Sequence, residues 1–244
     1  MFQRGFSSIA GMDEVGRGSL AGPVCVGVSV IDASVARGID GLIDSKALTE
    51  KKRLALVPQI ESWCTSAIGS ASPEEIDALG MTFSLRLAGQ RALAQVTAAG
   101  AFPEALLLDG KHDWLSSPAP DLLGSLDAAT SLYERLVTEA WQDAGHVPWC
   151  GPVTMLIKGD FTSATIAAAS VLAKVYRDDL MTELDRDYPG YGWAKNKGYG
   201  AKAHREKLEA DGPTVLHRLS WNLPVTPEQM NAALTARIME NYGN

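Results

Sequence analysis

The chain has 244 residues, 46% of them hydrophobic, enough to bury the core of one domain with an appendage or of two small domains. A formal net charge of −7 argues against a protein that coats nucleic acid or a membrane surface through overall positive charge. Three widely spaced cysteines fit reduced thiols in the cytoplasm, and the longest uncharged run, residues 18–31, is too short to span a bilayer.

The first predicted strand, residues 8–12, leads directly into the adjacent acids Asp13 and Glu14 and then into Gly16-Arg17-Gly18. Glycines permit backbone angles through which a strand cannot continue. We therefore expect both acids at a strand end, where an immediate turn would let them serve one metal site. A solvated turn explains these residues equally well, because Asp, Glu and Gly are common in loops, so the choice depends on further acids.

The next strand follows after a short loop, which favours antiparallel pairing with the first because a parallel partner needs a longer crossover. Asp44-Ser45-Lys46 then precedes a helix whose predicted N-cap is Thr49. Lys46 beside free helix N–H groups suits a phosphate, although an exposed lysine before a helix is the commoner case. The elements predicted up to residue 98 are strands at 23–31 and 64–71 and helices at 49–63, from Pro73 onward and at 81–98.

Two more short apolar strands are each followed by an acid, first Asp109 and later Asp160. The intervening residues 111–151 are assigned no chemistry. A long helix after Asp160 has an uncharged first half, which predicts its burial against the sheet. The elements predicted in this part are strands at 104–108 and 152–157 and helices at 121–144 and 163–184.

An aromatic and glycine-rich loop at residues 187–200 contains interleaved lysines, a composition that suits a sugar–phosphate chain. Residues 186–221 carry seven Lys or Arg, Arg218 among them, against four Asp or Glu. Without the strand-end acids, a purely structural aromatic loop would be a serious alternative. Helices are predicted at 201–210 and from about residue 226 onward.

Four carboxylates, Asp13, Glu14, Asp109 and Asp160, thus come from three separate strand ends with no histidine motif nearby. Such a set favours hard cations such as Mg²⁺ or Mn²⁺ over zinc, which usually takes His or Cys ligands. Two such ions roughly 3.5–4 Å apart stabilise the attacking and leaving oxygens of a phosphodiester displacement. The ions would reverse the local charge, so an acidic site is compatible with nucleic-acid binding.

Six ordered blocks within residues 7–223 carry a family resemblance. They are Gly-x-Asp-Glu-x-Gly-Arg-Gly from residue 11, Asp44-Ser45-Lys46, Asp109-Gly110, Lys158-Gly159-Asp160, the stretch from Ala168 to Asp178 that includes Ser170, Lys174 and Arg177, and Lys197-Gly198-Tyr199. Together they resemble bacterial type 2 ribonuclease H, also called ribonuclease HII. The resemblance implies an α/β ribonuclease H-like fold: a central mixed β-sheet flanked by helices, plus a C-terminal helical portion. It also implies a catalytic core at 1–185, with 111–151 as an insertion, and a substrate-binding portion at 186–244.

The same resemblance implies a metal-dependent endoribonuclease that cuts the RNA-containing strand of RNA–DNA hybrids and single ribonucleotides embedded in duplex DNA, leaving 3′-hydroxyl and 5′-phosphate ends. The four acids would be catalytic and hold the metal. Gly16-Arg17-Gly18 would approach the ribose 2′-OH, Tyr199 would pack on the neighbouring sugar, and Lys46 would hold a phosphate. The substrate-binding residues implied are Gly16, Arg17, Gly18, Lys46, Ser170, Lys174 and Tyr199.

Two features depart from the family pattern: Asp109 and Asp160 are farther apart than usual, and Phe161 stands where a small polar residue is common. Asp178 could be a fifth site acid, but we favour an ion pair with Arg177 or a nearby lysine.

The alternatives to this function are another nuclease of the same superfold, such as a junction resolvase or type 3 ribonuclease H, and a non-catalytic hybrid-binding module. Four intact acids argue against the binding module. We expect a monomer without a membrane partner.

Overall fold

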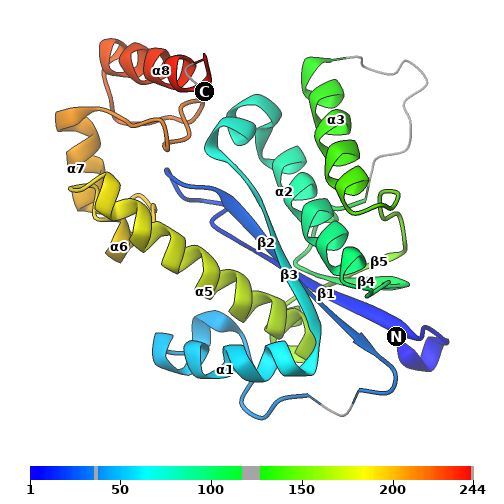
Figure 1. The fold of residues 1–244 in the computed structure, drawn as a ribbon. Helices are drawn as coiled ribbons and strands as arrows, with labels where there is room; N and C mark the ends of the chain where they lie inside the picture. Colours follow the sequence, from blue (N-terminus) through cyan, green and yellow to red (C-terminus); the bar gives the residue numbers. More distant parts are fainter. Residues whose placement is uncertain (36–37, 117–126, 243–244) are drawn as a thin grey trace.

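The computed structural model describes residues 1–35, 38–116 and 127–242 and centres on a five-stranded sheet in the order β3-β2-β1-β4-β5 (Figure 1). The strands β1 and β2 pair antiparallel, as do β2 and β3, whereas β1, β4 and β5 are parallel. The predicted mixed sheet and the antiparallel first pair are therefore confirmed. The strands are β1 (Ser8–Val15), β2 (Val24–Asp32), β3 (Thr65–Ala71), β4 (Ala105–Asp109) and β5 (Val153–Leu156).

Helices cover both faces of the sheet, α2 and α3 on one and α5 with α1 on the other (Figure 1). Helices α6 to α8 and their loops form the C-terminal portion beyond the end of α5. The α-helices are α1 (Glu50–Trp63), α2 (Pro73–Ala98), α3 (Ala128–Asp143), α4 (Gly159–Thr162), α5 (Ala164–Asp187), α6 (Trp193–Asn196), α7 (Lys202–Asp211) and α8 (Pro227–Tyr242), and two 3₁₀ turns are η1 (Phe2–Arg4) and η2 (Ser45–Ala47). In the described ranges no helix is both long and apolar enough to cross a membrane.

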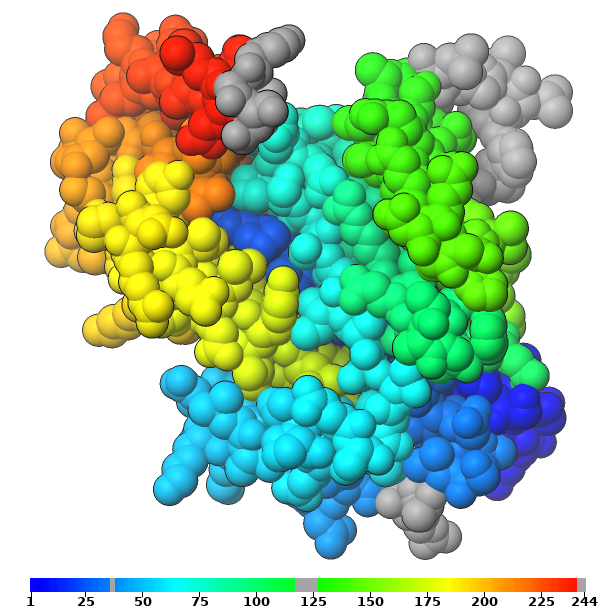
Figure 2. All heavy atoms as spheres, in the orientation of Figure 1, coloured from blue at the N-terminus to red at the C-terminus, as the bar shows by residue number. Residues whose placement is uncertain are grey.

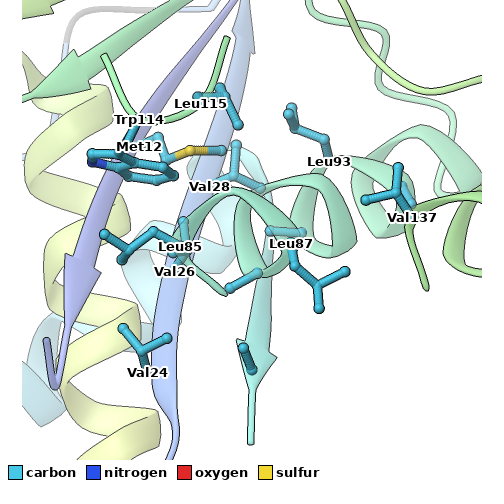
Figure 3. Close-up of a cluster of buried hydrophobic side chains, with 14 of the residues drawn as sticks. Met12, Val24, Val26, Val28, Leu85, Leu87, Leu93, Trp114, Leu115 and Val137 are labelled. Carbon is cyan, nitrogen blue, oxygen red and sulfur yellow. The ribbon is translucent and has the colours of Figure 1, made fainter. Parts of the chain in front are cut away.

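The larger hydrophobic cluster lies between the sheet and α2 with α3 (Figure 3). Alternation along β2 places Val24, Val26 and Val28 on this face, where they meet leucines of α2. Trp114 and Leu115, which follow β4, cover Met12 of β1 in the same cluster. Burying each such side chain contributes roughly 1.5–3 kcal/mol, so this face supplies much of the folding free energy.

The opposite face of the sheet accepts α5 at very close range because two glycines leave room for it. A Cβ added to Gly11 would lie 2.3 Å from the carbonyl carbon of Thr165, and one on Gly27 would lie 2.4 Å from the Ala169 oxygen. The uncharged first half of α5 is buried here, as predicted. This close packing brings Ser170 of α5 next to the end of β1.

Several element boundaries differ from those predicted. Strand β1 continues to Val15, so Asp13 and Glu14 lie inside the strand, kept there by pairing with β2. The two helices predicted after residue 72 form one helix, α2, with a kink at Gly80 (φ 71°). Strand β5 ends at Leu156, two residues before Lys158 enters the left-handed region (φ 55°). The start of the predicted 121–144 helix lies outside the described residues; the described helix begins at Ala128.

The C-terminal portion has its own hydrophobic cluster, which includes Trp193, Leu208 and Leu219. Leu20 and Ala21, from the loop between β1 and β2, belong to the same cluster. The C-terminal portion is therefore packed directly against the loop that follows the first two acids. The proposed division at residues 185 and 186, with 111–151 as an insertion, stays a prediction.

Candidate active site

A cleft of about 180 Å³ opens at the carboxyl end of β1. Nine of the eleven predicted site residues line it; Asp109 and Asp160 do not. A groove of about 660 Å³ beside α2 is larger, but it contains none of the predicted residues. The cleft is lined by Asp13, Glu14, Val15, Gly16, Arg17, Gly18, Ser45, Lys46, Ser170, Lys174 and Tyr199.

Asp13 is nearly buried at the end of β1 and is held in an anionic environment. Its Oδ1 accepts a hydrogen bond from the Glu14 backbone N–H at 2.8 Å. Burial raises the pKa of Asp13 to about 7; a hydrogen bond from Ser170 opposes the shift, while the negative charges of Glu14 and Asp109 add to it. Burial also raises the pKa of Glu14, although Arg17, 3.6 Å away, counteracts the effect.

Asp109 and Asp160 lie at the same edge of the sheet because β1, β4 and β5 run parallel. Leu108 pairs with Met12, so Asp109 follows at the level of Asp13. The Gly159 N–H donates to Asp109 Oδ1 at 2.7 Å, which fixes the start of α4, the short helix that carries Asp160. Burial, followed by the charges of Asp109 and Asp44, raises the pKa of Asp160 to about 6.

The chemistry of this donor set fits a hard divalent cation. All four groups are carboxylates, and the raised pKa values of Asp13, Glu14 and Asp160 reflect burial and mutual repulsion that a cation would relieve. Across the described parts of the chain, however, no three His, Cys, Asp or Glu side chains are already grouped as a metal-ligand set. Asp13, Glu14, Asp109 and Asp160 could hold a metal ion only after their side chains draw together.

Lys46 feels the charges of several acids at once. Burial lowers its pKa, but the charges of Asp13, Asp44, Asp160 and Asp109 outweigh burial and raise it above its ordinary value. The Asp44 side chain accepts from the Lys46 backbone N–H at 2.8 Å and so orients the η2 turn. Beside it, the Ser45 and Ser170 hydroxyls lie 2.9 Å apart, linking this turn to α5.

Lys174 lines the cleft, but its ammonium group is already paired. Its Nζ lies 2.5 and 2.6 Å from the two carboxylate oxygens of Asp178, one helical turn away, and Arg53 is 3.9 Å from the same group. Asp178 therefore forms the expected ion pair, with Lys174 and not Arg177 as its closest partner. Arg177 instead donates to main-chain carbonyls.

The glycine-bracketed turn and Tyr199 both line the cleft. Gly16 adopts a φ of 85°, and a Cβ there would lie 2.1 Å from Arg177 Nε, so this position requires glycine. Gly18 does not use the left-handed region, and a Cβ there would meet no atom beyond its chain neighbours within 4 Å. The Tyr199 ring is 39% exposed and lies 5.7 Å from the Arg177 guanidinium.

Sequence reasoning missed four residues that shape the site: Asp44, Ser45, Arg177 and Arg218. The first three lie in blocks that carried the resemblance, which was the signal available. Arg218 was counted in the local basic excess of residues 186–221, but it is fully buried and donates to the Gly16 and Arg17 carbonyls. Lys197, from the same basic segment, also turns inward, donating to the Asp178 carbonyl and the Thr182 hydroxyl.

Comparison with known protein families gives one match over most of the chain. The ribonuclease HII family model matches residues 10–110 and 126–223. Ribonuclease HII of Streptomyces avermitilis is 44% identical over 218 residues, covering 89% of this chain and 78% of that protein. The Vibrio parahaemolyticus ribonuclease HII is 38% identical over 221 residues, covering 90% of this chain and 87% of that protein.

Solved structures share the fold at lower identity. A complex of PCNA with ribonuclease HII from Archaeoglobus fulgidus gives a TM-score of 0.59 at 23% identity, covering 88% of this chain and 95% of that chain. Bst-RNase HIII in complex with Mn²⁺ gives a TM-score of 0.59 at 22% identity, covering 95% of this chain and 70% of that chain. These likenesses confirm the ribonuclease H-type fold. The family match and the identity to the bacterial relatives together show that the chain belongs to the ribonuclease HII family and is a ribonuclease H nuclease.

Proposed function

We propose that this nuclease cleaves the RNA-containing strand of RNA–DNA hybrids, and the strand at single ribonucleotides embedded in duplex DNA, to give 3′-hydroxyl and 5′-phosphate ends. One observation carries the proposal: a set of acidic side chains lies at the same sheet edge as a cleft lined by a glycine-bracketed turn and an exposed tyrosine. A module that only bound a hybrid would not need to gather carboxylates, which repel phosphate.

Asp13, Glu14, Asp109 and Asp160 are the proposed ligands of Mg²⁺ or Mn²⁺, two ions during catalysis. Bound there, the ions would activate water and stabilise charge on the attacking and leaving oxygens. The Mn²⁺ complex of a ribonuclease HIII of the same fold supports the choice of ion class. The protein itself holds the acids at one edge of the sheet, where the Gly159 N–H fixes Asp109 and Ser170 opposes the rise in the pKa of Asp13.

Substrate contacts are proposed for the residues that line the cleft. Gly16-Arg17-Gly18 would meet the ribose 2′-OH, the group that distinguishes RNA from DNA, and Tyr199 would pack on the neighbouring sugar. Lys46, in the η2 turn before α1, would hold a phosphate, with Ser170 beside it. Lys174 would take part only if its pair with Asp178 opens or accepts a phosphate as well.

The C-terminal portion, residues 186–244, is proposed to hold the duplex against the core. Exposed Arg186, Lys195, Lys202 and Arg205 offer positive charge there, Lys202 beside Glu206, whereas Arg218 and Lys197 are used inside the protein. We also propose a monomer working in the cytoplasm, where the three free cysteines would stay reduced.

The test is incubation of the protein with a DNA duplex that carries one ribonucleotide, with magnesium or with EDTA. We expect a single nick at the ribonucleotide, with 3′-hydroxyl and 5′-phosphate ends, only when magnesium is present. An all-DNA duplex and the Asp109→Asn variant serve as controls and should give no product. Cleavage in EDTA, or of the all-DNA duplex at a similar rate, would contradict the proposal.

A further inference from the structure

Two arginines, Arg177 on α5 and Arg218 between α7 and α8, are completely buried beneath the Gly16-Arg17-Gly18 turn. In the ranges that the structure describes, neither guanidinium has a carboxylate within salt-bridge distance. A buried cation is tolerated only when its donors are hydrogen-bonded. The acceptors of these two side chains therefore indicate what each one holds in place.

Arg218 holds the carbonyl groups of the turn itself. Its Nη2 donates to the Gly16 oxygen at 2.6 Å and its Nη1 to the Arg17 oxygen at 2.8 Å. The same guanidinium donates to the Gly22 oxygen at 3.2 Å, on the far side of the loop. Both carbonyls of the turn are thus directed into the protein by one side chain.

In a trans peptide the C=O and the N–H point in opposite directions. Fixing the Gly16 and Arg17 carbonyls inward therefore directs the N–H groups of Arg17 and Gly18 outward, away from Arg218. Both residues are exposed and line the cleft. Within the described part of the chain neither N–H donates a hydrogen bond, so both remain available to a substrate oxygen.

Arg177 joins this turn to the loop that carries Tyr199. Its Nη2 donates to the Ser19 hydroxyl at 2.7 Å, and that hydroxyl donates to the Gly16 oxygen at 2.9 Å. Its Nη1 donates to the Lys197 oxygen at 2.8 Å, and its guanidinium lies 5.7 Å from the Tyr199 ring centroid. The turn and the Tyr199 loop are therefore held by neighbouring guanidinium groups.

We propose that Arg218 is a positioning residue that sets the discrimination between ribose and other sugars by fixing the turn with the Arg17 and Gly18 N–H groups toward the sugar. This inference rests on the proposed function, in which the turn meets the 2′-OH. Arginine is needed because its planar fork reaches several carbonyls at once. Lysine carries its three donors on a single nitrogen and cannot reproduce the two-pronged contact with the Gly16 and Arg17 carbonyls.

The experiment compares Arg218→Lys with Arg237→Lys as a matched control. Arg237 is also buried in the C-terminal portion, but it donates to Asp77, Val215 and His217 and not to the turn. For each protein, kcat/KM is measured on two duplexes that differ only in carrying a ribose or a 2′-fluoro sugar at one position. We expect Arg218→Lys to reduce the ribose preference at least about tenfold. Arg237→Lys should lower the melting temperature but keep the preference.

A folded Arg218→Lys variant with an unchanged ribose preference would overturn the inference. Equal cleavage of the two duplexes by the unmodified protein would instead refute the proposed function. If Arg218→Lys does not fold, amide hydrogen exchange decides the question in the Asp109→Asn protein, which should bind without cutting. The Arg17 and Gly18 amides should be protected by the ribose duplex and not by the 2′-fluoro duplex. Equal exchange with both duplexes would overturn the inference.

Discussion

The four acids at the carboxyl edge of β1, β4 and β5 are the first residues to test. We expect Asp13→Asn, Glu14→Gln, Asp109→Asn and Asp160→Asn each to reduce the cleavage rate by about 100-fold or more, because each removes a proposed metal ligand. Duplex binding should survive, since the exposed cations of the C-terminal portion are unchanged. Single-turnover cleavage and binding in EDTA measure the two effects. If a variant cleaves at a rate within a few-fold of the parent protein, the residue replaced in it is not a site acid.

Substitutions at the two glycines of the turn should distinguish an effect on stability from an effect on substrate contact. Gly16→Ala is strained by the φ of 85° and by the approach of Arg177 to 2.1 Å, so it should lose about 1–3 kcal/mol of stability. Gly18→Ala has open space and should fold as stably as the parent protein. Its cleavage rate should nevertheless fall, because the added methyl group would occupy the path of the sugar. Urea unfolding and cleavage assays on both variants check this; an active Gly18→Ala protein would exclude close contact there.

The distance between α5 and the sheet controls where Ser170 stands relative to Asp13. Gly27→Ala would place a methyl group 2.4 Å from the Ala169 oxygen, so α5 must move outward. We expect a loss of about 1–3 kcal/mol and a lower cleavage rate. Ser29→Ala is the control, because it removes a hydrogen bond to the Thr165 oxygen on the same face without adding volume. If Gly27→Ala keeps full activity, the site does not depend on the close packing of this helix.

The C-terminal portion contains a buried pair of neutral histidines. His217 Nδ1 accepts from the Thr214 N–H, so its Nε2 carries the proton and donates to His204 Nε2 at 3.0 Å; His204 Nδ1 then donates to the Tyr199 oxygen. Burial, followed by the charge of His204, lowers the pKa of His217 from 6.5 to about 3. Below pH 6.5 the unfolded chain therefore binds a proton at His217 that the folded protein does not bind. The free energy of unfolding consequently decreases as the pH is lowered.

This linkage predicts a pH-dependent difference between variants. His217→Gln should be less stable than the parent protein at pH 7.5, and that difference should shrink by about 2 kcal/mol at pH 5. His146→Gln, at an exposed histidine, is the control for losing an imidazole away from this buried pair. Urea unfolding at the two pH values, in magnesium, measures both. A constant difference for His217→Gln would mean that His217 is protonated in the folded state.

The whole protein should be stabilised by the metal that its acids are proposed to hold. Without metal, the repulsion among these carboxylates opposes folding, so magnesium should raise the melting temperature. Asp160→Asn relieves part of this repulsion, so its metal-free form should melt at or above the metal-free parent protein, and magnesium should raise its melting temperature less. Melting both proteins in EDTA and in magnesium tests this. A clearly destabilised metal-free Asp160→Asn protein would indicate that Asp160 mainly pairs with a cation such as Lys46.

The sequence by itself determined the features that arise from local signals. The Thr49 cap, the alternation of valines in β2 and the uncharged half of α5 each depend on neighbouring residues, and the structure contains all of them. The acids that follow short apolar strands were also visible, because three parallel strands bring their carboxyl ends to one edge.

Only the tertiary structure decided which charged side chains are exposed to solvent and which are buried and stabilise the site. Arg218 donates to the Gly16 carbonyl, 202 positions away in the chain, and no periodic pattern in the sequence can predict such a contact. The pairing of Lys174 with Asp178, the placement of Ser45 beside Ser170 and the burial of Arg177 likewise depend on how α5 packs on the sheet. The sequence gives the charge of each residue, but its hydrogen-bond partners and its burial are established only when distant segments pack together.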